Sequence, residues 1–141
     1  MNRTKKNIQI QVDGEDSVGP LTIFEPLMFN FNSSNILFSN TINLKIGNNF
    51  KSTSFSIDTP GTYGNVKASN GSVSYDLGVD VELAPGIFHR TIVVTLTPRF
   101  MLINRTDQPI FFREHGTDHQ IRIEQRSEAP FYNISSRSTS K

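Results

Sequence analysis

Two histidines and an aspartate lie close together near the end of the sequence, and their residue types are those of metal ligands. His115 and His119 are four residues apart, with Asp118 beside the second. This spacing brings two imidazoles to one metal ion when both lie on one face of a helix. Gly116 and the alternating segments on either side place these residues in a hairpin loop instead. We therefore expect a solvated loop, with no metal and no other cofactor.

The acidic and nucleophilic residues show no arrangement that catalysis requires. Asp80 and Glu82 are two residues apart in an alternating segment, so both point into water from one face of a strand. No glycine-rich phosphate loop, nucleophile elbow or Ser-His-Asp grouping occurs. The absence of cysteine removes thiolate nucleophiles and thiolate zinc sites. The sequence predicts that the protein is not an enzyme.

Composition predicts one soluble domain. The chain has 141 residues and a formal net charge of +1, which argues against a surface built for nucleic acid or acidic membranes. No apolar run approaches the ~18 residues needed to span a bilayer. The basic start of the chain has no apolar stretch behind it, so no secretory signal is evident.

Residue usage and periodicity together predict an all-β fold. Ser, Thr and Asn account for 40 of the 141 residues, and these types favour turns and strands over helix interiors. Apolar and polar residues alternate repeatedly with a period of two, for example at 8–12, which we expect to be an edge strand. The denser apolar run at 91–96 predicts a central strand, and Asn70-Gly71 predicts a hairpin. We expect an antiparallel β-sandwich of roughly eight to ten strands, without an internal repeat.

Asn104 is the most informative polar residue. The alternation places it on the same face as Phe100 and Leu102, which should be buried. An unpaired amide there would cost about 1–3 kcal/mol, so Asn104 must find hydrogen-bond partners. It either clamps a turn or, through such a clamp, shapes a sheet edge on which a partner strand pairs.

Several segments in order resemble one repeat of the adaptor-binding region, also called SHR-BD, of the vacuolar protein sorting 13 family. The stretch from Pro98 to Asn104 is the most specific part, and Phe50 stands where the family pattern has a tryptophan. The segments that carry the resemblance are 25–31, 42–47, 54–58, Gly61, 77–81 and 93–104.

This resemblance implies a β-sandwich repeat within a large, rod-like lipid transfer protein at membrane contact sites. Such a protein is cytoplasmic and peripheral at organelle membranes, where adaptor proteins with short Pro-x-Pro motifs recruit it. Neighbouring repeats of the same protein are the other implied partners. In the family each repeat carries an asparagine at the position of Asn104. We expect the repeat at 23–134 and a flexible polar tail at 135–141. Residues 1–22 are unassigned: an edge strand, the end of a preceding repeat, or a foreign extension.

These observations lead to a hypothesis for function: a module that binds a proline-containing peptide by β-strand addition. Asn104 would act as the backbone clamp, Arg99, Phe100 and Leu102 would shape the adjoining strand, and Phe111 would be an exposed contact. One alternative is a purely structural repeat in which Asn104 holds a turn. A second alternative is a carbohydrate- or lipid-binding sandwich.

Overall fold

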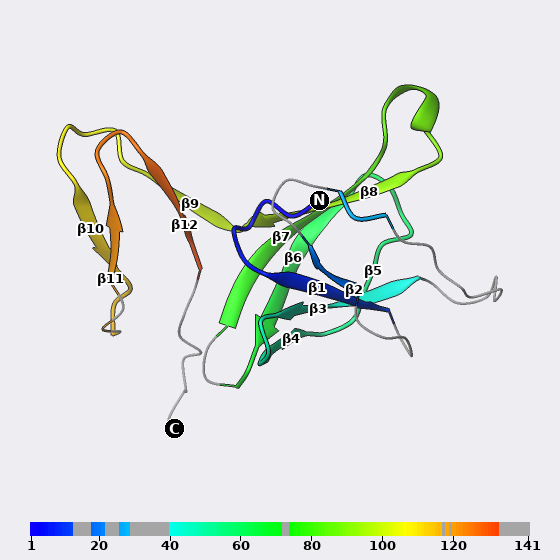
Figure 1. Cartoon of the computed structure of the whole chain (residues 1–141), viewed down its shortest axis with the longest axis horizontal. Helices are drawn as coiled ribbons and strands as arrows, with labels where there is room; N and C mark the ends of the chain where they lie inside the picture. Colours follow the sequence, from blue (N-terminus) through cyan, green and yellow to red (C-terminus); the bar gives the residue numbers. More distant parts are fainter. Residues whose placement is uncertain are drawn as a thin grey trace.

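The described part of the chain is built from β-strands and one turn of 3₁₀ helix (Figure 1). It is a computed structural model that describes residues 1–12, 18–21, 26–28, 40–71, 74–116, 118 and 120–132, with 18–21 as backbone alone. Its elements are β1 (Ile8–Val12), β2 (Val18–Leu21), β3 (Thr41–Ile46), β4 (Phe50–Ser52), β5 (Phe55–Ser56), β6 (Thr62–Ser69), β7 (Ser74–Leu83), η1 (Gly86–Phe88), β8 (Ile92–Pro98), β9 (Phe100–Ile103), β10 (Ile110–Arg113), β11 (Gln120–Ile123) and β12 (Glu128–Phe131).

The predicted antiparallel all-β fold is confirmed. The twelve strands among the described residues exceed the expected eight to ten, because strands as short as β4 and β5 cannot display an alternating pattern. Eight strands form one sheet in the order β2-β1-β3-β4-β6-β7-β8, with β5 paired to β3. This sheet curls into a half-barrel (Figure 1).

The core lies inside the curl of this sheet. β7 shows the pattern that builds it, since Leu77, Val79 and Val81 are buried while the residues between them are more exposed. The same alternation buries one face of β1, β3 and β6. The buried apolar cluster consists of Ile8, Ile10, Ile42, Leu44, Ile46, Ile57, Val66, Ala68, Leu77, Val79, Val81, Leu96 and Tyr132.

Two strand positions differ from the sequence-based predictions. β1, expected at an edge, lies between β2 and β3, and β8, expected to be central, ends the sheet order. Residues at the start of the chain run beside β8: the Arg3 N–H donates to the Leu96 carbonyl and the Leu96 N–H to the Met1 carbonyl, both at 2.8 Å. Alternation reports which face of a strand is buried, but it carries no information about lateral neighbours.

Turn signals were more reliable. The hairpin predicted at Asn70-Gly71 joins β6 to β7, which pair from Thr62 opposite Val81 to Ser69 opposite Ser74. Gly47 has a φ of 56° in the reversal between β3 and β4, a conformation that glycine adopts without a Cβ clash. Alternating apolar residues at 27, 29 and 31 also predict a strand, but this segment falls mostly outside the described residues.

Two ribbons of two strands each extend from the main sheet (Figure 1). β8 ends at Pro98, and the chain leaves the sheet as β9, which pairs with β12. β10 and β11 form the second ribbon, at the far left of the view. The residues of the peptide-binding hypothesis all lie on these ribbons or at their junction with β8.

Candidate peptide-binding site on the two ribbons

Asn104 joins three stretches of backbone at the end of β9. Its side chain is 1% exposed, and Nδ2 faces the carbonyl oxygens of Gln108, Ile123 and Glu124 at 2.8, 3.2 and 3.0 Å. Oδ1 accepts hydrogen bonds from the N–H and Oγ1 of Thr106 at 2.9 and 2.8 Å. The expectation that Asn104 is buried and hydrogen-bonded is confirmed. Because the amide is fully used, it can influence a ligand only by positioning the strands.

The backbone around Asn104 extends the same clamp. The Asn104 N–H donates to the Ser127 carbonyl at 2.8 Å, and the Arg126 N–H donates to the Thr106 carbonyl at 3.3 Å. These bonds tie the end of β9 to the turn before β12. The geometry of one ribbon is therefore coupled to that of the other through a single buried side chain.

β9 leaves one hydrogen-bonding edge open within the described part of the chain, where β12 is its only neighbouring strand. In an antiparallel ladder the hydrogen-bonded pairs recur at every second residue. Since the Asn104 N–H bonds to Ser127, Leu102 also faces β12. The N–H and C=O groups of Met101 and Ile103 therefore point to the opposite edge.

A proline in β12 agrees with this assignment. Pro130 lies opposite Met101, at a pair whose main-chain groups point away from each other. Proline has no N–H to donate, so this is a position where it costs no ladder bond. Met101 and Ile103 are 41% and 56% exposed, which keeps their side chains accessible beside the open edge.

Aromatic rings line one face of the ribbons. The expectation that Phe100 lies on a buried face is wrong: β9 has left the main sheet and pairs with β12 alone among the described strands, and Phe100 is 41% exposed. Its ring centroid lies 6.5 Å from that of Phe131. The Phe131 ring meets the edge of Phe112 at a centroid distance of 5.1 Å. Leu102 is half-buried on the same side of β9 as Phe100. The structure therefore brings Phe100 and Leu102 together, next to the open edge.

Arg99 lies at the bend where β8 becomes β9. Its guanidinium is 3.2 Å from the Asp76 carboxylate of β7 and 5.1 Å from the centre of the Phe100 ring. The Arg99 N–H also donates to the Asp76 carbonyl at 3.4 Å. A half-exposed ion pair contributes less than about 1 kcal/mol, so the main effect of Arg99 is to orient the start of β9.

Phe111 lies apart from the other predicted residues. It is 60% exposed, and its neighbours Ile110 and Phe112 point to the opposite face of β10. Its ring centre is 6.0 Å from the Arg122 guanidinium on β11. Phe111 is therefore accessible, but the structure does not bring it to Phe100 and Leu102.

A feature that the sequence analysis missed is a duplicated turn. The tripeptide Asn-Arg-Thr occurs at 2–4 and again at 104–106. Asn2 is fully buried, and its Oδ1 accepts hydrogen bonds from the N–H and Oγ1 of Thr4 at 3.0 and 2.7 Å, as Oδ1 of Asn104 does from Thr106. Its Nδ2 donates to the carbonyl of Lys6, four residues on, at 2.9 Å. The prediction that no internal repeat exists is wrong, and the repeated tripeptide was the signal.

Comparison with known proteins decides the family. The family model described as "Vacuolar-sorting associated protein 13, adaptor binding domain" matches residues 1–141. The chain belongs to this adaptor-binding family. The resemblance noted from the sequence is thereby confirmed, and the match includes the first 22 residues.

Curated relatives are lipid transfer proteins by name. The chain is 27% identical over 132 residues to mouse "Intermembrane lipid transfer protein VPS13A". The aligned stretch covers 94% of the chain and 4% of the relative. It is 30% identical over 118 residues to human VPS13C, an alignment that covers 84% of the chain and 3% of the relative. It is 32% identical over 114 residues to vps13E of Dictyostelium discoideum, an alignment that covers 76% of the chain and 3% of the relative. The chain thus corresponds to a small fraction of each relative's length.

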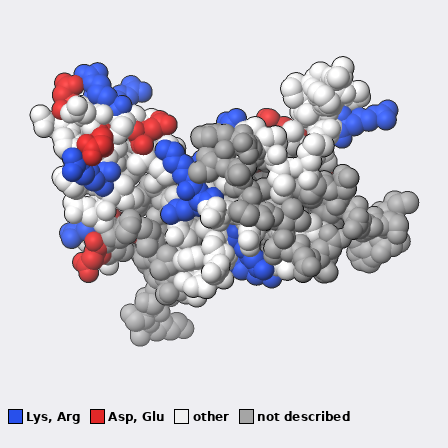
Figure 2. Space-filling view, viewed as in Figure 1, with Lys and Arg blue, Asp and Glu red and all other residues white. Residues whose placement is uncertain are grey.

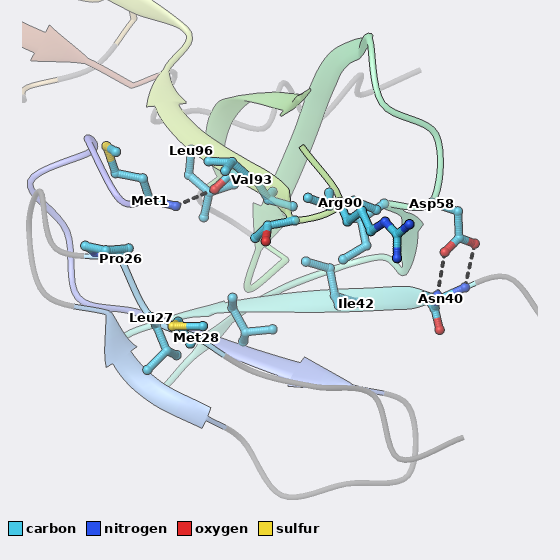
Figure 3. Close-up of a pocket in the computed structure, with 15 residues that line it drawn as sticks. Met1, Pro26, Leu27, Met28, Asn40, Ile42, Asp58, Arg90, Val93 and Leu96 are labelled. Carbon is cyan, nitrogen blue, oxygen red and sulfur yellow. Dashed lines mark hydrogen bonds between the residues drawn. The ribbon is translucent and has the colours of Figure 1, made fainter. Parts of the chain in front are cut away.

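The adaptor-binding fold also contains a cavity of about 430 Å³ between β3 and β8 (Figure 3). Its lining is mostly apolar and includes Leu27, Met28 and Ile42. At one end the Asp58 carboxylate accepts two hydrogen bonds from Asn40, each 2.6 Å long. β3 and β8 do not pair with each other among the described strands.

Neither a cluster of metal ligands nor a membrane-spanning helix occurs in the described part of the chain. Among the described residues no group of three or more His, Cys, Asp or Glu side chains is placed to hold a metal ion. His115 and Asp118 are exposed, and His119 lies outside the described part. No helix within the described ranges has the length and hydropathy to cross a membrane.

Charged side chains of both signs gather over the β10–β11 ribbon (Figure 2). Two exposed ion pairs contribute: Arg122 with Glu124 at 2.9 Å, and Arg126 with Asp107 at 2.7 Å. Opposite charges at the surface offset each other, so the ribbon presents no field of one sign. This end of the molecule therefore presents apolar side chains and main-chain groups rather than a surface of one charge.

Tyr132 links the end of β12 to the first Asn-Arg-Thr turn. Its hydroxyl donates a hydrogen bond to the Thr4 carbonyl, and its ring meets the edge of Tyr75 at a centroid distance of 5.4 Å. Burial raises the pKa of Tyr132 to about 12; the side chain of Thr4 opposes the shift and Tyr75 adds to it. Tyr132 is therefore expected to remain protonated in the folded protein well above pH 10.

This pKa predicts a loss of stability at alkaline pH. Since tyrosine titrates near pH 10 in the unfolded chain, the contribution of Tyr132 is complete below pH 10 and is lost as the pH rises from 10 through 12. We expect that loss to be about 2 kcal/mol. Urea unfolding of the wild type and of Tyr132→Phe, compared at pH 9 and pH 11.5, measures it. The difference between the two proteins should shrink at pH 11.5, and an unchanged difference would refute the assignment.

Proposed function

We propose that this chain is a non-catalytic module that binds adaptor proteins through short Pro-x-Pro motifs. The adaptor segment adds as a strand to the open edge of β9, where the main-chain groups of Met101 and Ile103 point outward. Main-chain hydrogen bonds supply affinity, and the apolar side chains around the edge supply selectivity. The observation that supports this proposal is the open edge, within the segment of strongest family resemblance.

The chemistry of a Pro-x-Pro motif matches such an edge. Alternate residues of an added strand direct their main-chain groups toward the sheet, and the residues between direct theirs away. Two prolines separated by one residue can therefore both face away, where their missing N–H is not required. The middle residue then pairs with β9, and the stiff prolines reduce the entropy lost on binding.

The predicted site residues take different parts in this proposal. Phe100 and Leu102 form the apolar wall beside the edge, and Arg99 orients the start of the strand. Asn104 acts through the backbone, by holding the end of β9. Phe111 is a separate exposed contact that a longer adaptor segment could reach on the other face of β10.

The cellular role follows from the family. The relatives are named as intermembrane lipid transfer proteins, and the chain matches only a few per cent of their length. We propose that the repeat at 23–134 forms part of such a protein; the tail expected at 135–141 lies outside the described residues. Its adaptors would direct the whole protein to organelle membranes and membrane contact sites. Membrane association would then be indirect, and the module itself would catalyse no reaction.

A single main-chain N–H provides the test. Met101→Pro removes one outward N–H from β9 at an edge position that tolerates proline, whereas Met101→Ala shortens the same side chain and keeps the N–H. We expect Met101→Pro to weaken binding of a fluorescent Pro-x-Pro peptide at least tenfold and Met101→Ala to weaken it only slightly. Fluorescence anisotropy titrations measure both.

The outcomes separate the hypotheses. Equal affinities for the two variants, with circular dichroism showing that both are folded, would place the peptide elsewhere than at the β9 edge. Wild-type protein that binds no Pro-x-Pro peptide would favour a structural repeat without a ligand of its own.

A further inference from the structure

The β10–β11 ribbon has an apolar face that the described part of the chain covers only in part: Ile123 is 1% exposed and the Phe112 ring packs against Phe131, but the β10 side chains stay accessible. Ile110 pairs with Ile123, and Phe112 with Ile121. On β10 these apolar side chains remain 37% and 39% exposed. β11 is the only strand paired with β10 in the described ranges, so one edge of β10 is open as well.

The same hairpin occurs near the start of the chain. β1 begins at Ile8, six residues after Asn2. β10 begins at Ile110, which is likewise six residues after Asn104. Ile8 pairs with Leu21, and Ile110 pairs with Ile123; both partners lie thirteen residues further on. The two hairpins therefore share the preceding turn, the starting position of the first strand and the register of its first pair.

The first hairpin shows what completes such a unit. β1 has a second neighbour, β3, with Ile8 opposite Ile46 and Ile10 opposite Leu44. With β3 in place, Ile8 and Ile10 are 0% and 5% exposed. Ile110 and Phe112, the corresponding residues of β10, have no such second strand beside them among the described residues, although Phe112 contacts Phe131.

We propose that the open edge of β10 pairs with a strand of the β3 type from a second module of the same fold. The β10–β11 ribbon then serves as the first hairpin of that module's sheet. Ile110 would lie opposite the counterpart of Ile46, and Phe112 opposite the counterpart of Leu44. The occupant is an antiparallel strand with alternating aliphatic residues, followed by the rest of a curled sheet.

This arrangement assigns the two faces of β10 to different partners. Ile110 and Phe112 belong to the junction between modules. Phe111 takes the position of Gln9, which lies on the less buried face of β1, so it remains exposed after docking. The docking edge on β10 is also separate from the open edge of β9.

A tandem protein tests the docking. Residues 25–30 and 128–133 have a glutamate, an aromatic residue and an asparagine at matching positions. In the tandem protein, residues 1–132 of a first copy can therefore be joined directly to residues 30–141 of a second copy. We expect the β10 amides of the first unit to exchange with deuterium at least a hundredfold more slowly in the tandem than in the single chain. Phe112→Asp in that unit should abolish the protection, whereas Arg113→Asp, on the opposite face of β10, should preserve it. Equal exchange in tandem and single chain would count against the docking.

A second measurement tests the register in the full single chain, independently of the folding of a second unit. Because the chain has no cysteine, each disulfide reports an introduced pair. Gln9 of β1 lies opposite Lys45 of β3, and Phe111 takes the position of Gln9. Phe111→Cys should therefore couple faster to a peptide of residues 40–47 carrying Lys45→Cys than to one carrying Leu44→Cys. Equal coupling rates would overturn the proposal. Met101→Pro should leave both measurements unchanged, which separates this junction from the adaptor site.

Discussion

Replacing Asn104 by alanine is expected to lower the free energy of opening of the β10–β11 ribbon by about 3 kcal/mol. The substitution removes hydrogen bonds to Gln108, Ile123 and Glu124 and leaves the N–H of Thr106 without its side-chain acceptor. Each such bond contributes about 1 kcal/mol, and buried groups left unpaired add to the cost. Native-state hydrogen exchange should show the β10 and β11 amides exchanging roughly a hundredfold faster.

Asn2→Ala provides the matched control, since its side chain makes the same bonds to Thr4 in the other turn. Its effect should fall on β1 and β8, which that turn joins, and not on the ribbon. Unchanged exchange in β10 and β11 of Asn104→Ala would show that the clamp does not hold the ribbon. If Asn104→Ala remains folded but loses peptide binding, the clamp also serves recognition.

Leu77→Ala is expected to lower the global free energy of unfolding by about 3 kcal/mol. Leu77 is fully buried on β7, opposite Val66 of β6 and Pro98 of β8, so its truncation leaves a cavity in the apolar core. Urea denaturation followed by circular dichroism should show a lower midpoint with an unchanged slope.

Leu83→Ala tests whether burial is the cause. Leu83 is the same residue type on the same strand, but it is 50% exposed at the strand's end. We expect a loss below about 1 kcal/mol, because its surroundings can relax and little apolar surface returns to water. Similar losses for both variants would mean that the core does not centre on β7.

Much of the fold was predictable from local patterns. The alternation at Leu77, Val79 and Val81 identified both the strand and its buried face, since side chains of a strand point to opposite sides in turn. The neighbours of β1 and β8 were predicted wrongly, because pairing depends on how distant segments meet. Strands of two or three residues, such as β5, carry too few positions to show a period.

The candidate site shows the same division. The sequence correctly indicated that Asn104 is buried and hydrogen-bonded, because it shares a face with apolar residues. It could not indicate that Ile123 and Glu124 supply two of the carbonyls, since they are about twenty residues away along the chain. The open edge formed by Met101 and Ile103 was equally invisible, because an edge is defined by the strand that does not pair there.

By itself the sequence determined the all-β class, the buried faces of most strands, the importance of Asn104 and the family. These properties depend on residue type and short-range periodicity, which a linear chain records directly. The tertiary structure alone decided which strand edges remain open, that Phe111 lies away from Phe100, and that the two Asn-Arg-Thr turns precede equivalent hairpins. These features arise from hydrogen bonds and packing between residues far apart in the chain, and those contacts exist only once the chain has folded.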